Sequence, residues 1–417
     1  MLAQAGRNVL LLEKEVFPRF HIGESLLPYN QAIFKELGLL PALEEAGFVP
    51  KYGAQFLVGN ASNEIRFLFS EGRYTRQPKA IQVERARFDH VLLRHAAQAG
   101  ADIREGWTVL RFRSLPDRVE VTAQSAQGLK ETFSANFLVD ASGRGNVTGN
   151  QESLREDHPR LRKLAVFGHF EGVHRDPGHA GGDTVIVRLE DKWFWLIPIT
   201  PTRTSVGCVM EKEAFRQARE VGPETLLRSL WEGSSVMRER MRLARPTGPV
   251  QTTTDFSYRN RRFVSHRLIR VGDAAGFMDP IFSAGVFLAM HSGKLAARAV
   301  EESLRDGDDG APRFQAYERG IRRAMSFYWE MVEHFYTTPF MEIFMNPRGK
   351  WNIPAAVNAV LAGELEGGWR LRWRMRLFFW LVRMQRYVPL VPRIQFRENA
   401  PMPRDQIPDT QDSPREG

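Results

Sequence analysis

Cysteine is almost absent from this chain of 417 residues, in which Cys208 stands alone. A single cysteine excludes an internal disulfide framework and favours a reducing cytoplasm as the compartment. Long apolar runs are lacking too: none reaches the roughly 18 residues of a membrane-spanning helix, and the first residues lack the pattern of a signal peptide. We therefore expect a cytoplasmic protein. Its 43% hydrophobic content is ordinary for a folded chain of two or three domains.

Lysine is scarce, with 10 residues against 48 arginines. The formal net charge is +9, but residues 369–397 alone carry eight arginines and no acidic residue. Since this segment holds nearly the whole excess, a general nucleic-acid-binding surface is not indicated. The segment could contact a membrane surface or dock an acidic partner. A packed terminal helix with a solvated arginine face is the simpler interpretation.

The glycine string G-x-G-x-x-G of dinucleotide-binding folds is missing. Residues 8–12 predict a strand that ends at Glu13, and an acid at such a strand end binds the ribose in a βαβ dinucleotide unit. That unit begins with an earlier strand and a glycine-rich turn, and neither precedes Asn8. We expect an N-terminally incomplete sequence that lacks its phosphate-binding loop. A solvated glutamate after an edge strand is the alternative.

Residues 268–290, LIRVGDAAGFMDPIFSAGVFLAM, predict a buried strand, a turn of small residues and a buried helix. The small residues let the backbone approach a flat or charged ligand, Asp273 supplies an acceptor, and the helix start offers N–H groups to an anion. An ordinary strand-to-helix connection is the alternative. A second small-residue turn, starting at Asp140, follows the strand 137–139, and ligands of open α/β sheets gather at such carboxyl ends.

The remaining pattern alternates between helices and strands. Helices are expected over 30–37 and from Val83, with Arg85 at its start, and strands near 52–69. From about 160 to 255 the pattern predicts strands, with candidates at 165–171, 184–189, 193–199 and 204–209. From residue 290 the chain is helical in character, with a core-facing stripe over 313–338 formed by Phe314, Tyr317, Ile321, Met325, Tyr328, Met331 and Phe335.

The string WFWLIP, residues 193–198, places two tryptophans at positions i and i+2 of a strand. Successive side chains of a strand alternate between faces, so Trp193 and Trp195 should form one aromatic wall. Ordinary core filling by paired aromatics is the alternative.

Several strings together carry a family resemblance. LLLEKE, FPRFHIGESLLP, VERARFD, VDASGR and RVGDAAGFMDP resemble the flavoprotein monooxygenase superfamily. Within it, WFWLIP is similar to the W-x-W-x-I-P string of flavin-dependent halogenases, and residues 277–285 fit their F-x-x-P-x-x-S-x-G pattern. The resemblance covers residues 1–340.

This resemblance implies an α/β fold with a Rossmann-like FAD-binding domain, an inserted and mainly antiparallel β-sheet substrate domain, and a helical C-terminal region. The expected boundaries are 1–155 and 256–305 for the two parts of the FAD domain, 156–255 for the substrate sheet, 306–397 for the helical region, and 398–417 for a disordered tail.

The resemblance also implies roles for individual residues. Glu13 would bind the adenosine ribose, Arg85 the linker region of the flavin, and Asp273 its ribityl or pyrophosphate part. The other expected cofactor contacts are Asp140, Gly272, Met278 and Pro280. A halide would bind at the N–H groups of Ala284 and Gly285. The expected catalytic residues are Lys51, Trp193, Trp195 and Ser283, and no metal site is expected.

The implied reaction uses reduced FAD, O2 and chloride or bromide to form hypohalous acid, with a flavin reductase as partner. Lys51 would deliver the halogen to an electron-rich ring, in a pathway of secondary metabolite biosynthesis. A compact ammonium can lose its proton once desolvated and then be halogenated, which a guanidinium cannot do. A solvated strand-edge lysine is the alternative. The two tryptophans would screen the space between flavin and substrate.

One departure concerns the substrate. Halogenases of free tryptophan have a glutamate before the serine of the last motif, and this chain has Phe282 there. A phenol or pyrrole substrate, free or tethered to a carrier protein, is therefore favoured. Two other interpretations stay open at this point: an aromatic hydroxylase or lipid-reducing flavoenzyme, and an inactive fragment that lacks its glycine loop.

Overall fold

The structure is a computed structural model that describes residues 1–59, 63–71, 77–212, 221–254, 257–347, 352–365 and 368–396. The predicted tail 398–417 lies outside the described residues.

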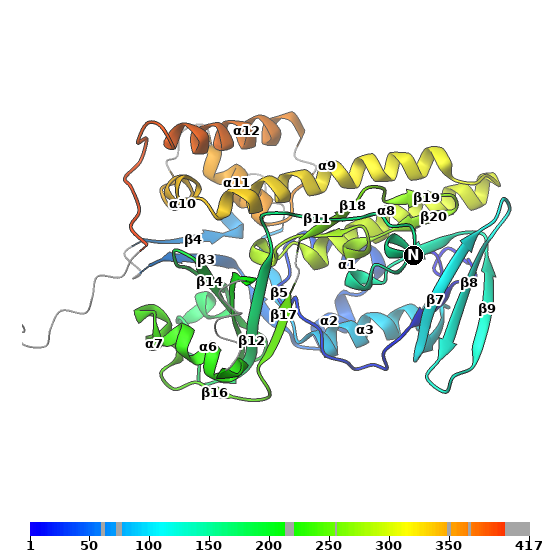
Figure 1. Cartoon of the computed structure of the whole chain (residues 1–417), viewed down its shortest axis with the longest axis horizontal. Helices are drawn as coiled ribbons and strands as arrows, with labels where there is room; N and C mark the ends of the chain where they lie inside the picture. Colours follow the sequence, from blue (N-terminus) through cyan, green and yellow to red (C-terminus); the bar gives the residue numbers. More distant parts are fainter. Residues whose placement is uncertain are drawn as a thin grey trace, which may run out of the picture.

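An eight-stranded sheet forms the centre of one half of the molecule (Figure 1). Its order is β16-β12-β15-β14-β13-β3-β4, with β17 also paired to β12, and every neighbouring pair is antiparallel except β3 and β13. The strands are β3 (Gly53–Val58), β4 (Asn63–Leu68), β12 (Lys163–Glu171), β13 (Thr184–Arg188), β14 (Lys192–Pro198), β15 (Arg203–Glu211), β16 (Arg245–Pro246) and β17 (Gln251–Thr254). The four strands expected between 165 and 209 are thus confirmed. The predicted domain boundaries stay a prediction.

Helices cover both faces of this sheet, because its strands alternate apolar side chains between two cores. One core contains Phe194 and Val206 and is closed by α6 (Pro223–Glu232) and α7 (Ser235–Met241), two helices that the sequence did not reveal. The other core contains Trp193 and Trp195 and is closed by the C-terminal helices (Figure 1).

The other half of the molecule carries short parallel strand pairs. β1 (Leu10–Glu13) pairs with β6 (Asp102–Glu105), and β10 (Leu138–Asp140) pairs with β20 (Leu268–Arg270), which also pairs with β19 (Val264–Ser265). The parallel pairing of β10 and β20 brings their carboxyl ends together, and Val271 N–H donates to the Asp140 carbonyl at 2.9 Å. The two predicted small-residue turns are therefore neighbours.

Further short elements complete this half. A meander of β7 (Trp107–Ser114), β8 (Val119–Ser125) and β9 (Lys130–Ala135), not expected from the sequence, lies at the end of the molecule farthest from the C-terminal helices (Figure 1). The remaining elements are α1 (Asn30–Leu37), α2 (Leu40–Glu45), β2 (Val49–Lys51), η1 (Phe69–Glu71), β5 (Ala80–Gln82), α3 (Arg85–Gln98), η2 (Gly143–Gly145), α4 (Val147–Gln151), β11 (Arg155–Asp157), η3 (Gly178–Gly182), β18 (Tyr258–Asn260), η5 (Gly272–Ala274), β21 (Gly276–Phe277) and η6 (Pro280–Phe282).

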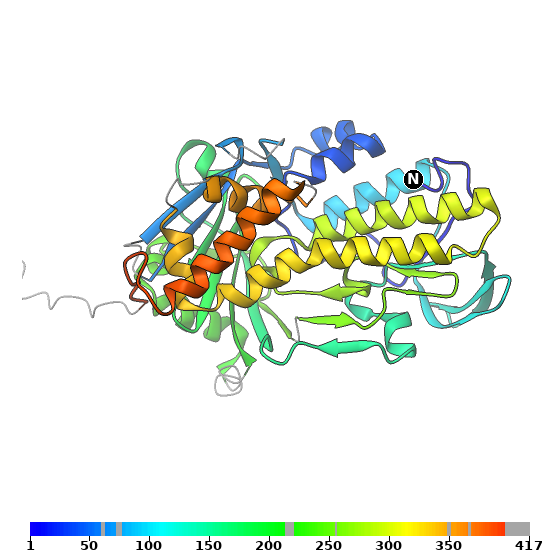
Figure 2. The ribbon, with the colours of Figure 1, turned by 90° about the horizontal axis from the view of Figure 1, so that it is seen from above.

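Two long helices, α8 (Gly285–Asp306) and α9 (Ala311–Phe335), run side by side along the molecule (Figure 2). Every residue of the predicted core-facing stripe of α9 is buried, which confirms that prediction. α10 (Thr338–Met345), α11 (Ile353–Leu361) and α12 (Gly368–Gln385) follow, and α12 is the outermost (Figures 1 and 2). None of the described helices has the length and apolar character needed to cross a membrane.

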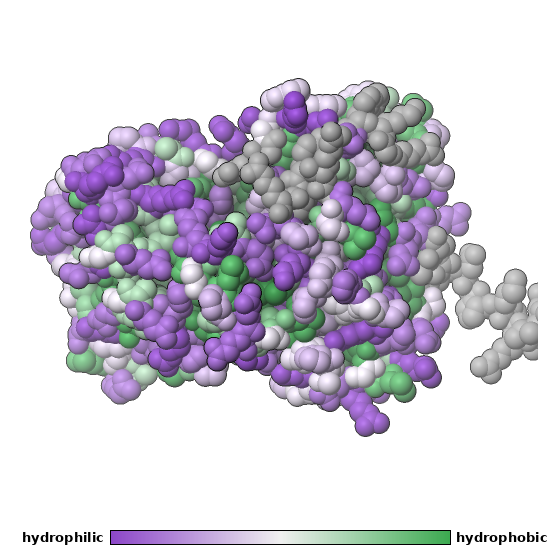
Figure 3. Space-filling view, turned by 180° about the vertical axis from the view of Figure 1, so that it is seen from behind, coloured by the Kyte–Doolittle hydropathy of each residue, from purple (hydrophilic) through white to green (hydrophobic). Residues whose placement is uncertain are grey.

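The outer surface is mostly polar on the face shown in Figure 3, where hydrophobic residues form only small groups between hydrophilic ones.

Gly207 makes room for the indole of Trp195. A Cβ atom at Gly207 would lie 2.2 Å from Cζ2 of Trp195 and 2.6 Å from Cβ of Phe167. We expect Gly207→Ala to lower the free energy of unfolding by about 1–3 kcal/mol, because the indole must leave its rotamer. Urea unfolding followed by tryptophan fluorescence measures this.

Gly293→Ala is the matched control, because a Cβ in that interior position of α8 meets no atom within 4 Å. It should preserve or raise stability, since alanine favours the helix by about 1 kcal/mol over glycine. Wild-type stability and fluorescence in Gly207→Ala would contradict the packing described.

Candidate active site

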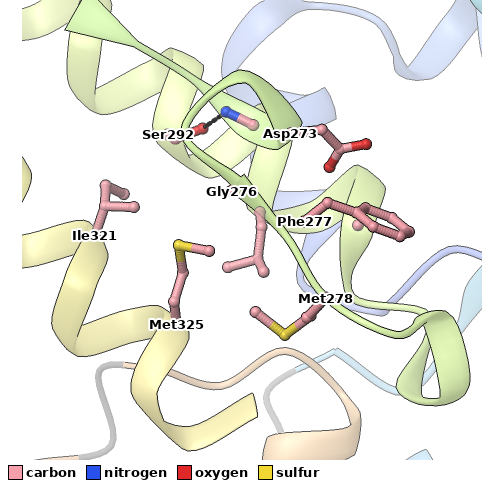
Figure 4. A pocket seen from close by; sticks show the side chains of 10 residues that line it. Asp273, Gly276, Phe277, Met278, Ser292, Ile321 and Met325 are labelled. Carbon is pink, nitrogen blue, oxygen red and sulfur yellow. Dashed lines mark hydrogen bonds between the residues drawn. The ribbon is translucent and has the colours of Figure 1, made fainter. Parts of the chain in front are cut away.

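The turn between β20 and α8 is held close to the helix behind it. Gly272 has φ +55°, its N–H donates to Ser292 Oγ at 2.8 Å, and a Cβ there would lie 3.0 Å from Cβ of Ala289. Glycine is therefore required for both backbone angle and space. Figure 4 shows Ile321 and Met325 of α9 on one side of this turn, whereas Asp273 and Phe277 point to the opposite side.

Met278 differs from its neighbours in orientation. Its side chain is buried and lies on the same side of the turn as Met325 (Figure 4). The side chain was expected beside a flavin ring; in this orientation only the backbone of Met278 is available to a ligand on the side of Asp273. Pro280 begins the next short turn, η6.

The Asp273 carboxylate accepts no hydrogen bond from any residue that the structure describes. Burial raises its pKa to about 6, although the positive charges of Arg144 and Arg85 oppose the rise. Its backbone carbonyl is fixed by the Tyr258 hydroxyl, which donates to it at 2.5 Å. A carboxylate that lacks a donor among the described residues suits a ligand that brings its own hydroxyl donors.

The first turn of α8 is open to an anion. Ala284 precedes the helix without a side-chain cap, and the first turn contains no acidic residue. Gly285 is exposed, and a Cβ there would meet no atom within 4 Å. Ser283 has φ +56° and directs the chain into the helix. N–H groups at such a helix start carry a partial positive charge.

Lys51 is 2% exposed at the end of β2, so the alternative of a solvated strand-edge lysine is wrong. Its Nζ donates to Ser25 Oγ at 2.8 Å and to the Leu26 carbonyl at 3.2 Å, and lies 5.5 Å from the centre of the Phe69 ring. Burial lowers its pKa from 10.5 to about 7, and the charge of Asp183 only partly opposes this. A substantial fraction of the amine is therefore neutral near pH 7.

Ser25 connects Lys51 to the central sheet. Its Oγ shares a hydrogen bond of 2.8 Å with Oγ1 of Thr184 on β13, and Gln82 Nε2 donates to the same Thr184 oxygen at 2.9 Å. The amine is thus fixed between the loop 17–30, the strand pair β2–β5 and the sheet.

The two tryptophans lie on one face of β14, as expected. Their ring centres are 5.9 Å apart, and both are buried. Trp195 Nε1 donates to Ser205 Oγ at 3.1 Å. Phe282 lies 5.8 Å from Phe335, which in turn lies 6.4 Å from Trp193, so all these rings belong to one apolar wall.

A hydrogen-bond chain joins Trp193 to the turn before α8. Trp193 Nε1 donates to the Tyr336 hydroxyl at 2.9 Å, and that hydroxyl donates to Asp279 Oδ2 at 2.6 Å. Asp279 Oδ1 accepts from Ile281 N–H at 3.1 Å, and burial raises the pKa of Asp279 to about 6 although the Tyr336 bond opposes the rise. Sequence reasoning missed Tyr336 and Asp279. Asp279 belongs to the string RVGDAAGFMDP, which carries part of the family resemblance, and this was the only sign in the sequence of its place in the site.

Arg85 fixes the loop 17–30. Its guanidinium forms a two-point ion pair with Asp89 at 2.8 and 2.9 Å and donates to the carbonyls of Ile22 and Gly23. Glu13 stands at the end of β1, where it was expected, and accepts from Glu15 N–H at 2.9 Å.

Asp140 is engaged within its own turn. Its carboxylate accepts from Ser142 N–H at 2.9 Å and from both the N–H and the hydroxyl of Thr148. These bonds hold the carboxylate inside the protein. The geometry gives Asp140 a part in shaping the turn that adjoins Gly272 and does not present its oxygens to a ligand.

Comparison with known proteins identifies the family. The family model described as tryptophan halogenase matches residues 75–342. A 1H-pyrrole-2-carbonyl-(peptidyl-carrier protein) brominase of Pseudoalteromonas luteoviolacea is 31% identical over 337 residues, which cover 80% of this chain and 81% of that protein. The chain belongs to the flavin-dependent halogenases.

Other halogenases agree with this assignment. A 1H-pyrrole-2-carbonyl-(peptidyl-carrier protein) chlorinase of Pseudomonas fluorescens is 29% identical over 398 residues, 89% of this chain and 87% of that protein. The structure of the flavin-dependent brominase Bmp2 superimposes with a TM-score of 0.81 at 28% identity, covering 92% of this chain and 95% of that chain. The myxobacterial chondrochloren halogenase CndH gives 0.75 at 31% identity, with coverage of 91% and 93%.

Membership confirms several predictions at the level of the family. Flavin-dependent halogenases have a Rossmann-like α/β fold, are oxidoreductases, and use FAD, halide and O2, as predicted for this chain. The alternatives of an aromatic hydroxylase and a lipid-reducing flavoenzyme are not supported. The donor-free carboxylate of Asp273, on the open side of its turn, fits the hydroxyl-bearing chain of a flavin cofactor.

Lys51 should make the stability of this halogenase depend on pH. An unfolded lysine keeps its proton up to a pKa of about 10.4, whereas the folded one loses it near 7. The unfolded state then binds more protons, so stability rises between pH 7 and 10, by up to about 1.4 kcal/mol per pH unit from this residue. Lys51→Met should remove that slope in urea unfolding, while the exposed Lys79→Met keeps it. Equal slopes in all three proteins would contradict a depressed pKa.

Tyr336→Phe should destabilise the halogenase more at pH 8 than at pH 5. Above pH 6 the Asp279 carboxylate is charged and needs the lost hydroxyl donor, which is worth about 1–3 kcal/mol. At pH 5 the carboxyl is protonated, and the loss is smaller. Urea unfolding at both pH values, with the exposed Tyr387→Phe as control, measures the difference. A loss of stability that is equal at the two pH values would argue against the Tyr336–Asp279 bond.

Proposed function

We propose that this halogenase chlorinates or brominates an electron-rich pyrrole or phenol ring held on a carrier protein, and that Lys51 delivers the halogen. The observation that carries the proposal is the buried Lys51 amine, with its pKa lowered to about 7. The printed activities of two relatives, which act on a pyrrole-2-carbonyl group of a peptidyl carrier protein, support the choice of substrate.

Lys51 acts as a nucleophile on hypohalous acid. Bound reduced FAD supplies the two electrons that, with O2 and halide, yield hypohalous acid. The neutral amine forms an N–halogen bond, and the hydroxide of hypohalous acid leaves as water with a proton from the amine. The aromatic ring then attacks the halogen, so that a C–halogen bond forms and the N–halogen bond breaks. The proton displaced from the ring carbon restores the amine.

Five groups would hold the cofactor in this proposal. Glu13 would bind the ribose, Arg85 would lie near the linker, and Asp273 would accept hydrogen bonds from the ribityl chain, beside the backbone of Gly272. The backbone from Met278 to Pro280 forms the edge of the ring site. Asp140 is a positioning residue, because its carboxylate is already bonded to Ser142 and Thr148.

The halide binds the N–H groups of Ala284 and Gly285. No side chain caps this helix start, and Ser283, with its positive φ, sets the direction of the turn that exposes it. An anion here gains from the helix dipole without taking up a proton.

Trp193 and Trp195 form the wall between the flavin side and the ring to be halogenated. Both are buried and fixed by hydrogen bonds through their indole nitrogens. A fixed apolar wall excludes water, which limits hydroxylation and loss of the hypohalous acid.

Phe282 supports a pyrrole or phenol over tryptophan. It is buried against Phe335 and offers no base, and pyrroles and phenols are nucleophilic enough to react without one. A separate flavin reductase is the proposed source of reduced FAD.

The test is halogenation by the purified chain supplied with FAD, a flavin reductase, NADH, bromide or chloride, and pyrrole or phenol substrates, free and on a carrier. We expect a mass gain of one halogen for hydrogen. Lys51→Ala should abolish this gain and retain flavin binding, whereas Lys79→Ala, an exposed lysine, should behave as the wild type. A hydroxylated product at unchanged yield in Lys51→Ala would overturn the proposal.

A further inference from the structure

One helix presents a regular stripe of arginines and aromatic rings to solvent. Successive residues of this stripe are three or four positions apart, so they lie on one side of a helix. They run along α12 and just past its end: Trp369, Arg372, Arg376, Trp380, Arg383 and Tyr387. All six are exposed, and the three aromatic residues retain 67%, 52% and 76% of their accessible surface. We name these six residues the α12 stripe.

The side of α12 that packs into the protein is formed by other residues than the stripe. The buried residues of this helix are Leu371, Met375, Phe378, Phe379, Val382 and Gln385. The end of the helix is also fixed, because the buried Glu342 of α10 accepts hydrogen bonds from Gln385 at 2.7 Å and from Arg393 at 3.0 Å. The stripe is therefore a rigid outward surface of the outermost helix (Figures 1 and 2).

The charge of the stripe is mostly uncompensated. Arg383 pairs with Glu330 at 3.4 Å, but no carboxylate in the described part of the chain lies within 4 Å of Arg372 or Arg376. The segment 369–397 contains eight arginines and no acid. Such a surface attracts an anionic partner and repels a basic one.

The residue types indicate a protein partner. Tryptophan, tyrosine and arginine are the types that dominate binding energy in protein interfaces. A helix that lies on a membrane inserts a continuous apolar face, and in α12 that face is occupied by the core of the protein.

The chain between α11 and α12 passes the Lys51 site. The residues that follow α11 lie against it: Ala362 packs with Phe69, whose ring faces Lys51, and a Cβ at Gly363 would lie 3.0 Å from Cβ of Tyr29. α12 starts five residues later, at Gly368. Ala362 and Gly363 thus connect the wall of the site with the chain that continues into α12.

We infer that the α12 stripe docks the acidic surface of the carrier protein that presents the aromatic ring to Lys51. The inference rests on the proposed function for the tethered substrate. Arginines provide orientation and a fast encounter, and the exposed aromatic rings provide the apolar contact.

Binding measured without turnover tests this inference. A peptidyl carrier protein loaded with 1H-pyrrole-2-carbonyl is titrated into the full chain by calorimetry. The variants are Arg372→Glu/Arg376→Glu and Trp380→Ala, with Arg111→Glu/Arg228→Glu as a control of equal charge change at exposed arginines of β7 and α6. We expect at least a tenfold rise in Kd for the first double variant and a smaller rise for Trp380→Ala. The control should keep the wild-type Kd, and added salt should weaken wild-type binding.

The kinetic arm separates this inference from the proposed function. The stripe variants should raise KM for the carrier-bound pyrrole, leave kcat close to that of the wild type, and leave halogenation of a free phenol unchanged. Halogenation that fails on every substrate would overturn the proposed function, whereas the binding measurement could still be interpreted by itself. Equal Kd values in wild type and stripe variants overturn the inference, as does absent wild-type binding. A loss of binding to vesicles of phosphatidylglycerol in the stripe variants, with carrier binding unchanged, overturns it in favour of a membrane.

Discussion

The burial of one amino group connects the parts of this halogenase. Lys51 Nζ lies between Ser25 of the loop 17–30 and the Phe69 ring after β4, and is almost completely removed from water. A buried ammonium is costly, so the surroundings favour the neutral amine and lower its pKa to about 7. The same burial lowers stability below pH 7 and leaves a neutral amine above it. It depends on the loop 17–30, which supplies Ser25 and Leu26, and on the Phe69 ring, against which Ala362 packs.

A second polar connection couples the sheet to the turn before α8. Trp193 on β14, Tyr336 after α9 and Asp279 before α8 come from three separate elements and share two hydrogen bonds. Because Trp193 and Asp279 are buried, neither can readily replace its Tyr336 partner with water. The aromatic wall and the turn before α8 are therefore held in a fixed position relative to each other.

Local periodicity made much of the fold predictable. The strands within 163–211 and the core-facing stripe of α9 were predicted correctly. Apolar side chains repeat with a period of 2 residues in a strand and 3.6 residues in a helix. The meander β7–β9 and the helices α6 and α7 were missed, since many of their positions are polar. The turn at Asp273 was located because it lies in the continuous string RVGDAAGFMDP. Lys51 lies outside the family strings and was assigned from its position between the loop 17–30 and the first strands of the sheet.

Contacts between distant segments were not predictable in this way. The partners of Lys51 in the loop 17–30 and the link from Trp193 to Asp279 depend on how side chains from several elements converge. Asp140 shows the converse problem: a strand-end aspartate has the chemistry of a ligand, and only its bonds to Ser142 and Thr148 show that its oxygens are already engaged. The direction of Met278 likewise depends on the packing of α9.

The most direct measurement is the titration of Lys51 itself. With lysine labelled by 13C at the ε carbon, the ten lysines give signals that can be followed by NMR from pH 5 to 11, and Lys51→Met assigns the one of interest. The account predicts that this signal titrates near pH 7. A Lys51 signal that titrates above pH 10 would contradict it.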